Sequence, residues 1–255
     1  MITLLSDFGL NDTYVGQMKG AILAVSPSVT LVDLTHAVPP RDVFAGAFLL
    51  STAVEPFPTG TTHVAVVDPG VGSARRAIAL RSNRGDVFVG PDNGLLWPAV
   101  VRLGGCALAI ELSEPRFWRP SPSSTFHGRD LFGPVAGHLA NGVALEHMGR
   151  PIHDPHKLEL PEPRGLEGEV IHIDTYGNLI TNLPAANLPE NFEVLVGDHR
   201  VPRASHYAAV AEGALLALIG SSGVLEISAR NASAAAITGA QRDTEVSVEP
   251  LPGLA

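Results

Sequence analysis

The sequence predicts an α/β N-terminal domain, with a central sheet flanked by helices, and a smaller all-β C-terminal domain of barrel or sandwich type. In the first half, short apolar runs alternate with segments of helical periodicity, which is typical of an α/β sheet with covering helices. In the last third, short alternating segments separated by turns dominate, which indicates a β-domain. We expect domains at 1–155 and 166–255, joined by a linker at 156–165.

The N-terminal elements follow from apolar spacing and from helix breakers. ITLL predicts a first strand, and YVGQMKGAILAV places apolar residues at helical spacing over 14–25 until Pro27 ends the helix. TLVDL predicts the next strand, and Asp42 is placed to cap a helix over 43–54. A last helix is expected in DLFGPVAGHLANG, over 130–142. Three more apolar runs predict strands: HVAVV, AIAL and DVFVG.

The C-terminal domain is predicted from five short segments. PIHDPHKLELPEP, from Pro151 to Pro163, is dense in proline and charge, as linkers between domains are. Beyond it, TYGN and SSG predict turns, and RNASAA predicts a loop that leads to a final helix or strand. The predicted strands are GEVIHID, NLITNL, FEVLVG, GALLALIG and VLEISA.

Composition narrows the class of protein. The chain has 255 residues, 45% hydrophobic and 17% charged, which is typical of a globular protein. A net charge of -9 without any Lys/Arg-rich run argues against a nucleic-acid partner. GALLALIG is far shorter than the roughly 20 residues that span a bilayer, and the N-terminus lacks a basic leader, so we expect a cytoplasmic protein without membrane contact. The single cysteine, Cys106, excludes an intrachain disulfide and is expected in the core.

Polar residues follow two of the predicted strands of the N-terminal sheet, at strand ends, where open α/β sheets bind ligands. Asp7, in SDFGLND, can accept hydrogen bonds from a vicinal diol such as a ribose, or can serve as an ordinary loop or cap residue. Asp68 ends an apolar run at the edge of the core, where a carboxylate needs a partner. Arg75 and Arg76 alternate to opposite faces of the outgoing strand, so only one can return to Asp68, as a structural clamp or as part of a reactive site.

Two further clusters carry polar groups. His127, beside Gly128 in STFHGRDLF, opens a helix and is suited to proton transfer near neutral pH, although a capping role fits as well. Asp174 ends a predicted strand and Asn178 follows a tight turn in HIDTYGNLITN, so both can face one crevice. In RNASAA, small residues allow backbone groups to approach the edge of a flat heterocycle, although an ordinary loop has the same composition.

Other common motifs are missing from the sequence. No GxGxxG follows a strand, and there is no P-loop, no HExxH and no metal-ligand spacing, so neither a bound phosphate nor a metal is indicated. His36, in DLTHAVPP, and His63 are interpreted as structural residues.

Seven segments in this order resemble the S-adenosyl-L-methionine hydroxide adenosyltransferase family, relatives of the enzymes that make 5′-fluoro- and 5′-chloroadenosine. The resemblance spans nearly the whole chain, and VVDPGVG with TFHGRD is its most specific part. It implies the two-domain fold above and a homotrimer with active sites between the N-domain of one subunit and the C-domain of its neighbour. It also implies displacement at ribose C5′ by water or hydroxide. The segments are SDFG, DLTH, VVDPGVGSARRAI, GPDNGLL, STFHGRDLFGPVA, IDTYGNLITN and LEISARNASAA.

The resemblance also implies roles for individual residues. Asp68, Arg75 and His127 match catalytic positions, so Arg75 is favoured over Arg76. The sulfonium leaves as a neutral thioether, so no metal, cofactor or general acid is expected, and the three side chains would orient and deprotonate the water. Asp7 matches the ribose-diol carboxylate, Asp174 and Asn178 the amino-acid end, Asn231 and Ala232 the adenine edge, and Tyr14 and Tyr176 the walls. Further candidate binding residues are Thr125, Phe126, Ser221, Ser222 and Glu226.

Two departures separate the chain from its halogenating relatives. Gly128 stands where the fluorinating enzyme has a halide-contacting serine, and Arg41 stands where that enzyme has an aromatic residue. The resemblance therefore favours water as nucleophile, and S-adenosyl-L-methionine as a substrate hydrolysed to adenosine and L-methionine. A chlorinase-like enzyme that uses halide and a non-catalytic sensor of adenosine or S-adenosyl-L-methionine stay open as alternatives.

Overall fold

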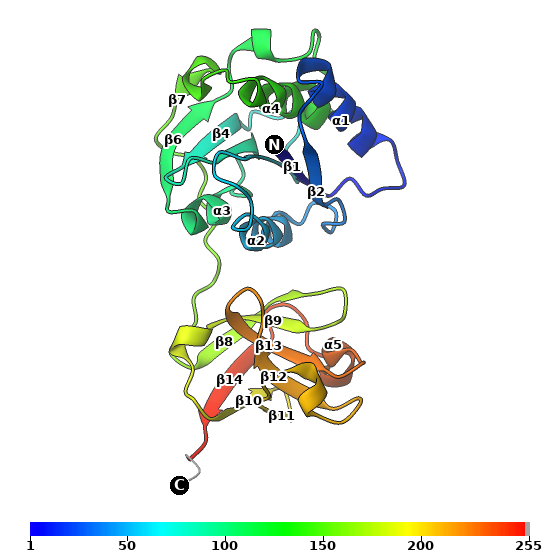
Figure 1. Ribbon diagram of the computed structural model, residues 1–255, viewed down its shortest axis with the longest axis vertical. Helices are drawn as coiled ribbons and strands as arrows, with labels where there is room; N and C mark the ends of the chain where they lie inside the picture. The colour runs from blue at the N-terminus through cyan, green and yellow to red at the C-terminus, as the bar shows by residue number, and fades with distance from the viewer. Residues whose placement is uncertain (253–255) are drawn as a thin grey trace. The chain divides into compact units, whose positions relative to one another are not determined.

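The fold is taken from a computed structural model that describes residues 1–252. The chain divides into two compact units, Met1–Leu160 and Pro161–Ala255 (Figure 1). The boundary between them lies within the proline-rich stretch. Most of that stretch, up to Leu160, belongs to the first unit, and Leu158 packs against one of the hydrophobic clusters there.

A seven-stranded mixed sheet forms the centre of the N-terminal unit, in the order β2-β1-β3-β5-β4-β6-β7. Strands β2, β1, β3 and β5 are parallel, and β4, β6 and β7 extend the sheet with antiparallel pairs. The parallel strands end at one edge, which brings the loops after β1 and β3 side by side. The strands are β1 Ile2–Ser6, β2 Leu31–Thr35, β3 Thr62–Val66, β4 Ala77–Ser82, β5 Val87–Pro91, β6 Cys106–Glu111 and β7 Arg150–Pro151.

Helices pack on this sheet in two pairs, α1 with α4 and α2 with α3 (Figure 1). Met18 and Val135 belong to one hydrophobic cluster, and Leu50 and Ala99 belong to a second. The helices are α1 Tyr14–Val25, α2 Val43–Ala53, α3 Trp97–Arg102 and α4 Gly133–Ala140. Because α3 and α4 have only six and eight residues, the unit is richer in sheet than predicted, and the helix-flanked description holds only in part.

Several local predictions can be compared directly with the structure. The predicted cap of α2 is confirmed, because the Asp42 carboxylate accepts a hydrogen bond from the Ala45 amide at 3.0 Å. The last helix begins earlier than predicted, with a π-helical turn over Gly128–Phe132 (η2) that continues into α4. The core position predicted for Cys106 holds in part: the residue packs against a hydrophobic cluster of the core but is only half-buried, at the start of β6 opposite Ser82.

Seven antiparallel strands form the C-terminal unit, in the order β11-β10-β14-β8-β9-β13-β12. The end strands approach each other, since the Ala204 amide donates to the Ala217 carbonyl at 2.8 Å, so the sheet is nearly a closed barrel. Buried residues such as Val170, Val194 and Ile227 fill its interior. The elements are β8 Glu167–Ile173, β9 Leu179–Pro184, β10 Phe192–Val196, β11 His199–Pro202, β12 Leu215–Ile219, β13 Val224–Ala229, α5 Ala234–Thr238 and β14 Glu245–Pro250.

Short 3₁₀ segments complete the two units, and they lie at Pro115–Phe117, Leu145–His147, Ala185–Asn187 and Tyr207–Ala209. Within residues 1–252, every helix falls short of the length and hydropathy that a membrane span requires.

Candidate active site

The loop after β3 brings Arg75 back onto Asp68. Arg75 Nε donates to both Asp68 carboxylate oxygens, at 3.0 and 3.1 Å, and Arg75 Nη2 donates to Oδ2 as well. The two side chains are 11% and 6% exposed, so the ion pair is largely buried. Arg76 points elsewhere, to the carboxylates of Asp92 and Asp154. Of the two arginines, Arg75 is therefore the one that returns to Asp68.

A glycine allows this loop to pack against the segment that carries His127. Gly72 has a φ of +78°, and a Cβ there would lie 2.5 Å from the carbonyl oxygen of Ser124. Only glycine meets both conditions without strain. Inside the loop, the Ser73 hydroxyl accepts the Arg75 amide hydrogen at 3.2 Å and donates to the Gly70 carbonyl at 2.7 Å. The backbone before Arg75 is thereby fixed.

His127 completes a three-residue contact. Its Nδ1 lies 2.7 Å from Arg75 Nη2, and a guanidinium can only donate, so Nδ1 accepts and the ring proton is on Nε2. Burial lowers the pKa of His127, and the charge of Arg75 lowers it further, while Asp68 and Asp130 act in the opposite direction. The imidazole is therefore neutral at neutral pH. The Arg75 guanidinium also lies 5.3 Å from the centre of the Phe132 ring, which restrains it from a second side.

Asp130 organises the chain around His127. Its carboxylate accepts two hydrogen bonds from Arg129, at 2.7 and 2.9 Å, and one from the Ser123 amide at 2.9 Å. Burial by itself would raise the pKa of Asp130, but these partners outweigh it and lower the pKa, so the carboxylate stays charged. The carboxylate of Asp130 therefore pairs with an arginine and a backbone amide. Among residues 1–252, no group of three His, Cys, Asp or Glu side chains could hold a metal ion.

An aromatic cluster lies next to His127 in the chain. The rings of Phe8, Tyr14 and Phe126 pack with centroids 5.4 to 6.1 Å apart, and Tyr14 is nearly half exposed. A Cβ on Gly128 would lie 3.2 Å from the Phe8 ring, so a larger residue there would press against the cluster. Thr125 is exposed beside it. Tyr14 and Phe126, both predicted binding residues, therefore form one apolar wall.

Asp7 lies at the same edge of the sheet as Asp68. Ser6 pairs with Val66 in the parallel register of β1 and β3, so both aspartates closely follow adjacent strand ends. The Arg41 amide, in a left-handed conformation with a φ of 67°, donates to Asp7 Oδ2 at 2.8 Å. Among residues 1–252, no hydrogen bond reaches Asp7 Oδ1, so this oxygen can accept from a ligand.

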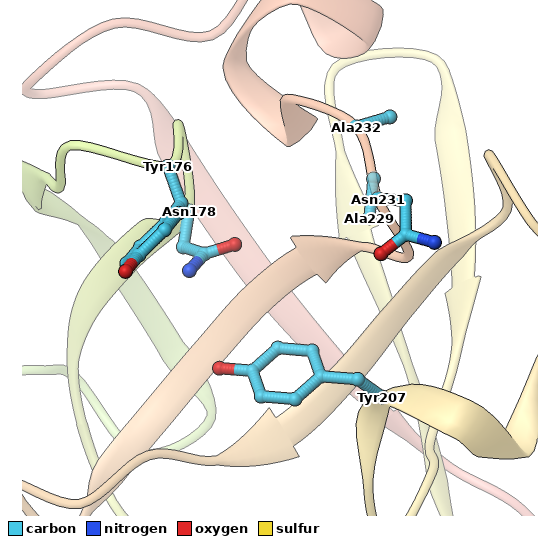
Figure 2. A pocket seen from close by; sticks show the side chains of 6 residues that line it. All are labelled: Tyr176, Asn178, Tyr207, Ala229, Asn231 and Ala232. Carbon is cyan, nitrogen blue, oxygen red and sulfur yellow. The ribbon is translucent and has the colours of Figure 1, made fainter.

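A pocket of about 530 Å³ opens in the C-terminal unit, a volume typical of small-molecule sites. Figure 2 shows the turn after β8 on one side of it, the chain after β13 on the other, and a tyrosine ring lying across it. The lining residues are Tyr176, Asn178, Tyr207, Ala229, Asn231 and Ala232.

Asp174 supports this pocket from behind and does not line it. Its Oδ1 accepts the amide hydrogens of Tyr176 and Asn178, both at 2.9 Å, and its Oδ2 accepts from Asn178 Nδ2 at 2.9 Å. The Asn178 carboxamide is thereby oriented with its oxygen available. Gly177 has a φ of +81°, and a side chain there would overlap Ser233, so glycine lets the two walls of the pocket approach each other.

Tyr207 is a pocket residue that the sequence did not indicate, because ASHYAAV has neither periodicity nor a motif. Its hydroxyl donates to Glu226 Oε1 at 2.6 Å, and Ser228 Oγ donates to the same oxygen at 2.7 Å. The hydrogen bond to Glu226, with burial, raises the pKa of Tyr207 to about 12. Glu226 is buried and therefore fixes the tyrosine ring. Ser221 and Ser222 lie in the turn before β13, at the opposite end of that strand from the pocket-lining Ala229.

Both units match known families of protein domains. Residues 2–149 match the SAM hydroxide adenosyltransferase N-terminal domain, and residues 168–247 match the C-terminal domain. The chain belongs to the SAM hydroxide adenosyltransferase family. The resemblance drawn from the seven sequence segments is thus confirmed.

Several members of the SAM hydroxide adenosyltransferase family are similar to this chain over most of their own length. The chain is 41% identical over 242 residues to an (R)-S-adenosyl-L-methionine hydrolase of Thermus thermophilus, which covers 91% of this chain and 93% of the relative. It is 32% identical over 218 residues to a fluorinase of Nocardia brasiliensis, covering 74% and 72%. A solved structure of an uncharacterized conserved protein from Thermotoga maritima has a TM-score of 0.92 and 34% identity, covering 98% of this chain and all of that one.

Proposed function

We propose that this protein hydrolyses S-adenosyl-L-methionine to adenosine and L-methionine. The contact among Asp68, Arg75 and His127 carries the proposal, because it gathers a carboxylate, a guanidinium and a neutral imidazole at the edge of the sheet where such folds bind ligands. The Thermus thermophilus relative is named (R)-S-adenosyl-L-methionine hydrolase, which supports S-adenosyl-L-methionine as the substrate. We extend the proposal to the R configuration that this name specifies.

The reaction is a displacement at C5′ of the ribose. A water oxygen forms a bond to C5′ while the bond from C5′ to sulfur breaks, and the bonding electron pair leaves with sulfur as a neutral thioether. The attacking oxygen then gives up one proton. Because the leaving group is already cationic in the substrate, catalysis depends on orienting the weak nucleophile and removing its proton.

The three side chains divide this task. The Arg75 fork holds the Asp68 carboxylate from one side, so its remaining lone pairs can accept a hydrogen bond from the water and then the proton. Because His127 Nδ1 accepts a hydrogen bond from Arg75, the ring proton is on Nε2. That proton can form a hydrogen bond to the water oxygen and orient the water towards C5′. Asp68 is thus the proposed base, and His127 with Arg75 the proposed orienting groups.

The substrate is held by groups in both units. We assign Asp7 to the ribose diol, with Oδ1 as its open acceptor. In the C-terminal unit, the backbone at Asn231 and Ala232 suits the edge of an adenine, with Tyr207 as a wall. Because Asn178 lines the same pocket, we reassign its carboxamide from the predicted amino-acid end to the adenine edge. Asp174 acts through Asn178, since its own oxygens bind the turn. Contacts of Ser221 and Ser222 with the substrate stay predictions.

We further propose that the protein works as a homotrimer with shared sites. The reactive trio belongs to one unit and the adenine pocket to the other, and a single substrate must meet both. Mixing inactive Asp68→Ala subunits with inactive Asn178→Ala subunits should restore part of the activity if sites are shared between subunits. Lack of recovery in verified mixed oligomers would refute sharing. The cytoplasmic location stays a prediction.

Product analysis tests the proposed reaction. The protein is incubated with each sulfonium epimer of S-adenosyl-L-methionine in water enriched in heavy oxygen, with and without chloride, and the products are separated by chromatography. Adenosine labelled in its 5′-hydroxyl, lost in Asp68→Ala of unchanged fold, is the expected result. Unlabelled adenosine would refute attack by water, 5′-chloroadenosine would indicate a halide enzyme, and tight adenosine binding without turnover would indicate a sensor.

A further inference from the structure

A chain of polar side chains lies behind Asp7 and takes no part in the proposed reaction. Ser6 Oγ lies 2.7 Å from His36 Nδ1, and His36 Nε2 lies 3.2 Å from Asp33 Oδ1. Asp33 Oδ2 in turn accepts from Lys19 Nζ at 2.6 Å. Ser6 and His36 are 0% and 4% exposed, whereas Asp33 and Lys19 are partly exposed. The chain therefore leads from the surface to the buried residue that precedes Asp7.

The position of the His36 ring proton follows from Asp33. Burial by itself would raise the pKa of Asp33, but Lys19 and His36 outweigh it and lower the pKa, so the carboxylate is charged. In a neutral ring, the carboxylate beside Nε2 favours the proton on that nitrogen, and Nδ1 then accepts from the Ser6 hydroxyl. Ser6 Oγ also accepts the Phe8 amide hydrogen at 3.3 Å. His36 thus restrains the backbone on both sides of Asp7.

Backbone contacts join the same two segments. The Gly9 amide donates to the His36 carbonyl at 2.8 Å, so the loop that contains Asp7 is attached to the end of β2. Five residues after His36, the left-handed Arg41 amide donates to Asp7 Oδ2. A non-glycine residue in this conformation is strained, and such strain is held by surrounding contacts. The His36 segment therefore supplies the hydrogen bond that orients the Asp7 carboxylate.

We propose that His36 is a positioning residue that, with Ser6 and Asp33, holds Asp7 in the orientation that selects a nucleoside with both ribose hydroxyls. This inference rests on the proposed assignment of Asp7 to the diol. The order Ser, His, Asp is that of a hydrolytic triad, but Ser6 has no exposed surface and no substrate can reach it. The three residues fix geometry and do not react.

His63 provides a matched control in the same sheet. It is fully buried, its Nδ1 lies 2.7 Å from the Thr3 hydroxyl, and its Nε2 lies 3.8 Å from Asp86. Its surroundings thus repeat the hydroxyl, imidazole and carboxylate order of the His36 chain without adjoining Asp7. Replacing either histidine by phenylalanine removes the hydrogen bonds and keeps a flat ring, so both variants lose stability.

The test compares the affinities of adenosine and 2′,3′-dideoxyadenosine, measured by calorimetry on the full-length protein. We expect the wild type to prefer adenosine by roughly tenfold or more, since the dideoxy compound cannot form the hydrogen bonds from the diol to a charged group. His36→Phe should lose most of this preference, and His63→Phe should keep it. Ser6→Ala should act like His36→Phe, and it serves as the second variant where the phenylalanine variant does not fold.

The outcomes separate this inference from the proposed function. An unchanged preference in folded His36→Phe or Ser6→Ala, an equal loss in His63→Phe, or a wild type without preference would each overturn it. Turnover of S-adenosyl-L-methionine is measured on the same samples. A wild type that prefers the diol and loses that preference in His36→Phe, but hydrolyses nothing, would refute the proposed reaction and support the positioning role.

Discussion

Replacing Arg75 by lysine separates the charge of this side chain from its shape. Arg75 binds both oxygens of Asp68 through Nε and Nη2, and the same Nη2 lies 2.7 Å from His127 Nδ1. Lysine carries one ammonium group on a flexible stem and cannot form a planar fork. The lysine nitrogen is also one bond closer to the backbone than Arg75 Nη2, the atom that contacts both Asp68 and His127. Arg75→Lys therefore retains a positive charge beside Asp68 but does not reach His127.

The size of the effect follows from the hydrogen bond to His127 that lysine cannot form. A hydrogen bond that involves a charged group contributes about 1.5–3 kcal/mol, and about 1.4 kcal/mol is a factor of ten in rate, so turnover should fall roughly 10- to 100-fold. Stability should fall less, because the charge pair with Asp68 persists. Arg75→Ala would instead leave a carboxylate that is only 6% exposed without its partner, which costs about 3–5 kcal/mol.

The assay is the initial rate of adenosine formation at saturating S-adenosyl-L-methionine, with thermal unfolding as the check on folding. Arg76→Lys is the matched control, because Arg76 is the next residue but pairs with Asp92 and Asp154. We expect its rate within about threefold of wild type, as for most substitutions away from a site. Near-wild-type turnover in Arg75→Lys, or an equal loss in Arg76→Lys, would show that the fork does not orient the reacting groups.

Three further predictions concern stability and ionisation. Gly72→Ala should lower the free energy of unfolding in urea more than Gly213→Ala, because both have a positive φ but only the Gly72 Cβ would meet neighbouring atoms; equal losses would contradict this. Burial lowers the pKa of His63 to about 4, so between pH 6.5 and 4 the unfolded chain binds the extra proton and stability should fall with falling pH, by up to about 3 kcal/mol. His63→Phe should reduce this dependence of stability on pH. If the stability of the variant and of the wild type fell equally between pH 6.5 and 4, the pH dependence would not come from His63. Glu226→Gln should move the pKa of Tyr207 from about 12 towards 10 in an ultraviolet titration, and an unchanged value would show that the carboxylate does not set it.

Much of the fold is determined by short-range sequence patterns. The helical spacing over 14–25 and the cap at Asp42 predict α1 and α2, because both depend on a few consecutive residues. The strands β6, β7, β11 and β14 and the short helix α3 were not predicted. In β14, Val246 and Val248 are buried in alternation, but pairing with β8 and β10 decides that this short segment is a strand. The choice of a nearly closed barrel over a sandwich likewise depends on the approach of β11 to β12.

In the candidate active site, too, some features follow from residue order and others only from tertiary packing. The sequence alone identified Asp68 at a strand end, the two arginines on opposite faces, His127 in a glycine-containing loop, and the family, because these are properties of residue order. Only the tertiary structure decided that Arg75 meets His127, 52 residues away, that Tyr207 lines the pocket, and that Asp174 orients Asn178. Hydrogen bonds between distant segments depend on how whole loops pack, and no local pattern in the sequence encodes that packing.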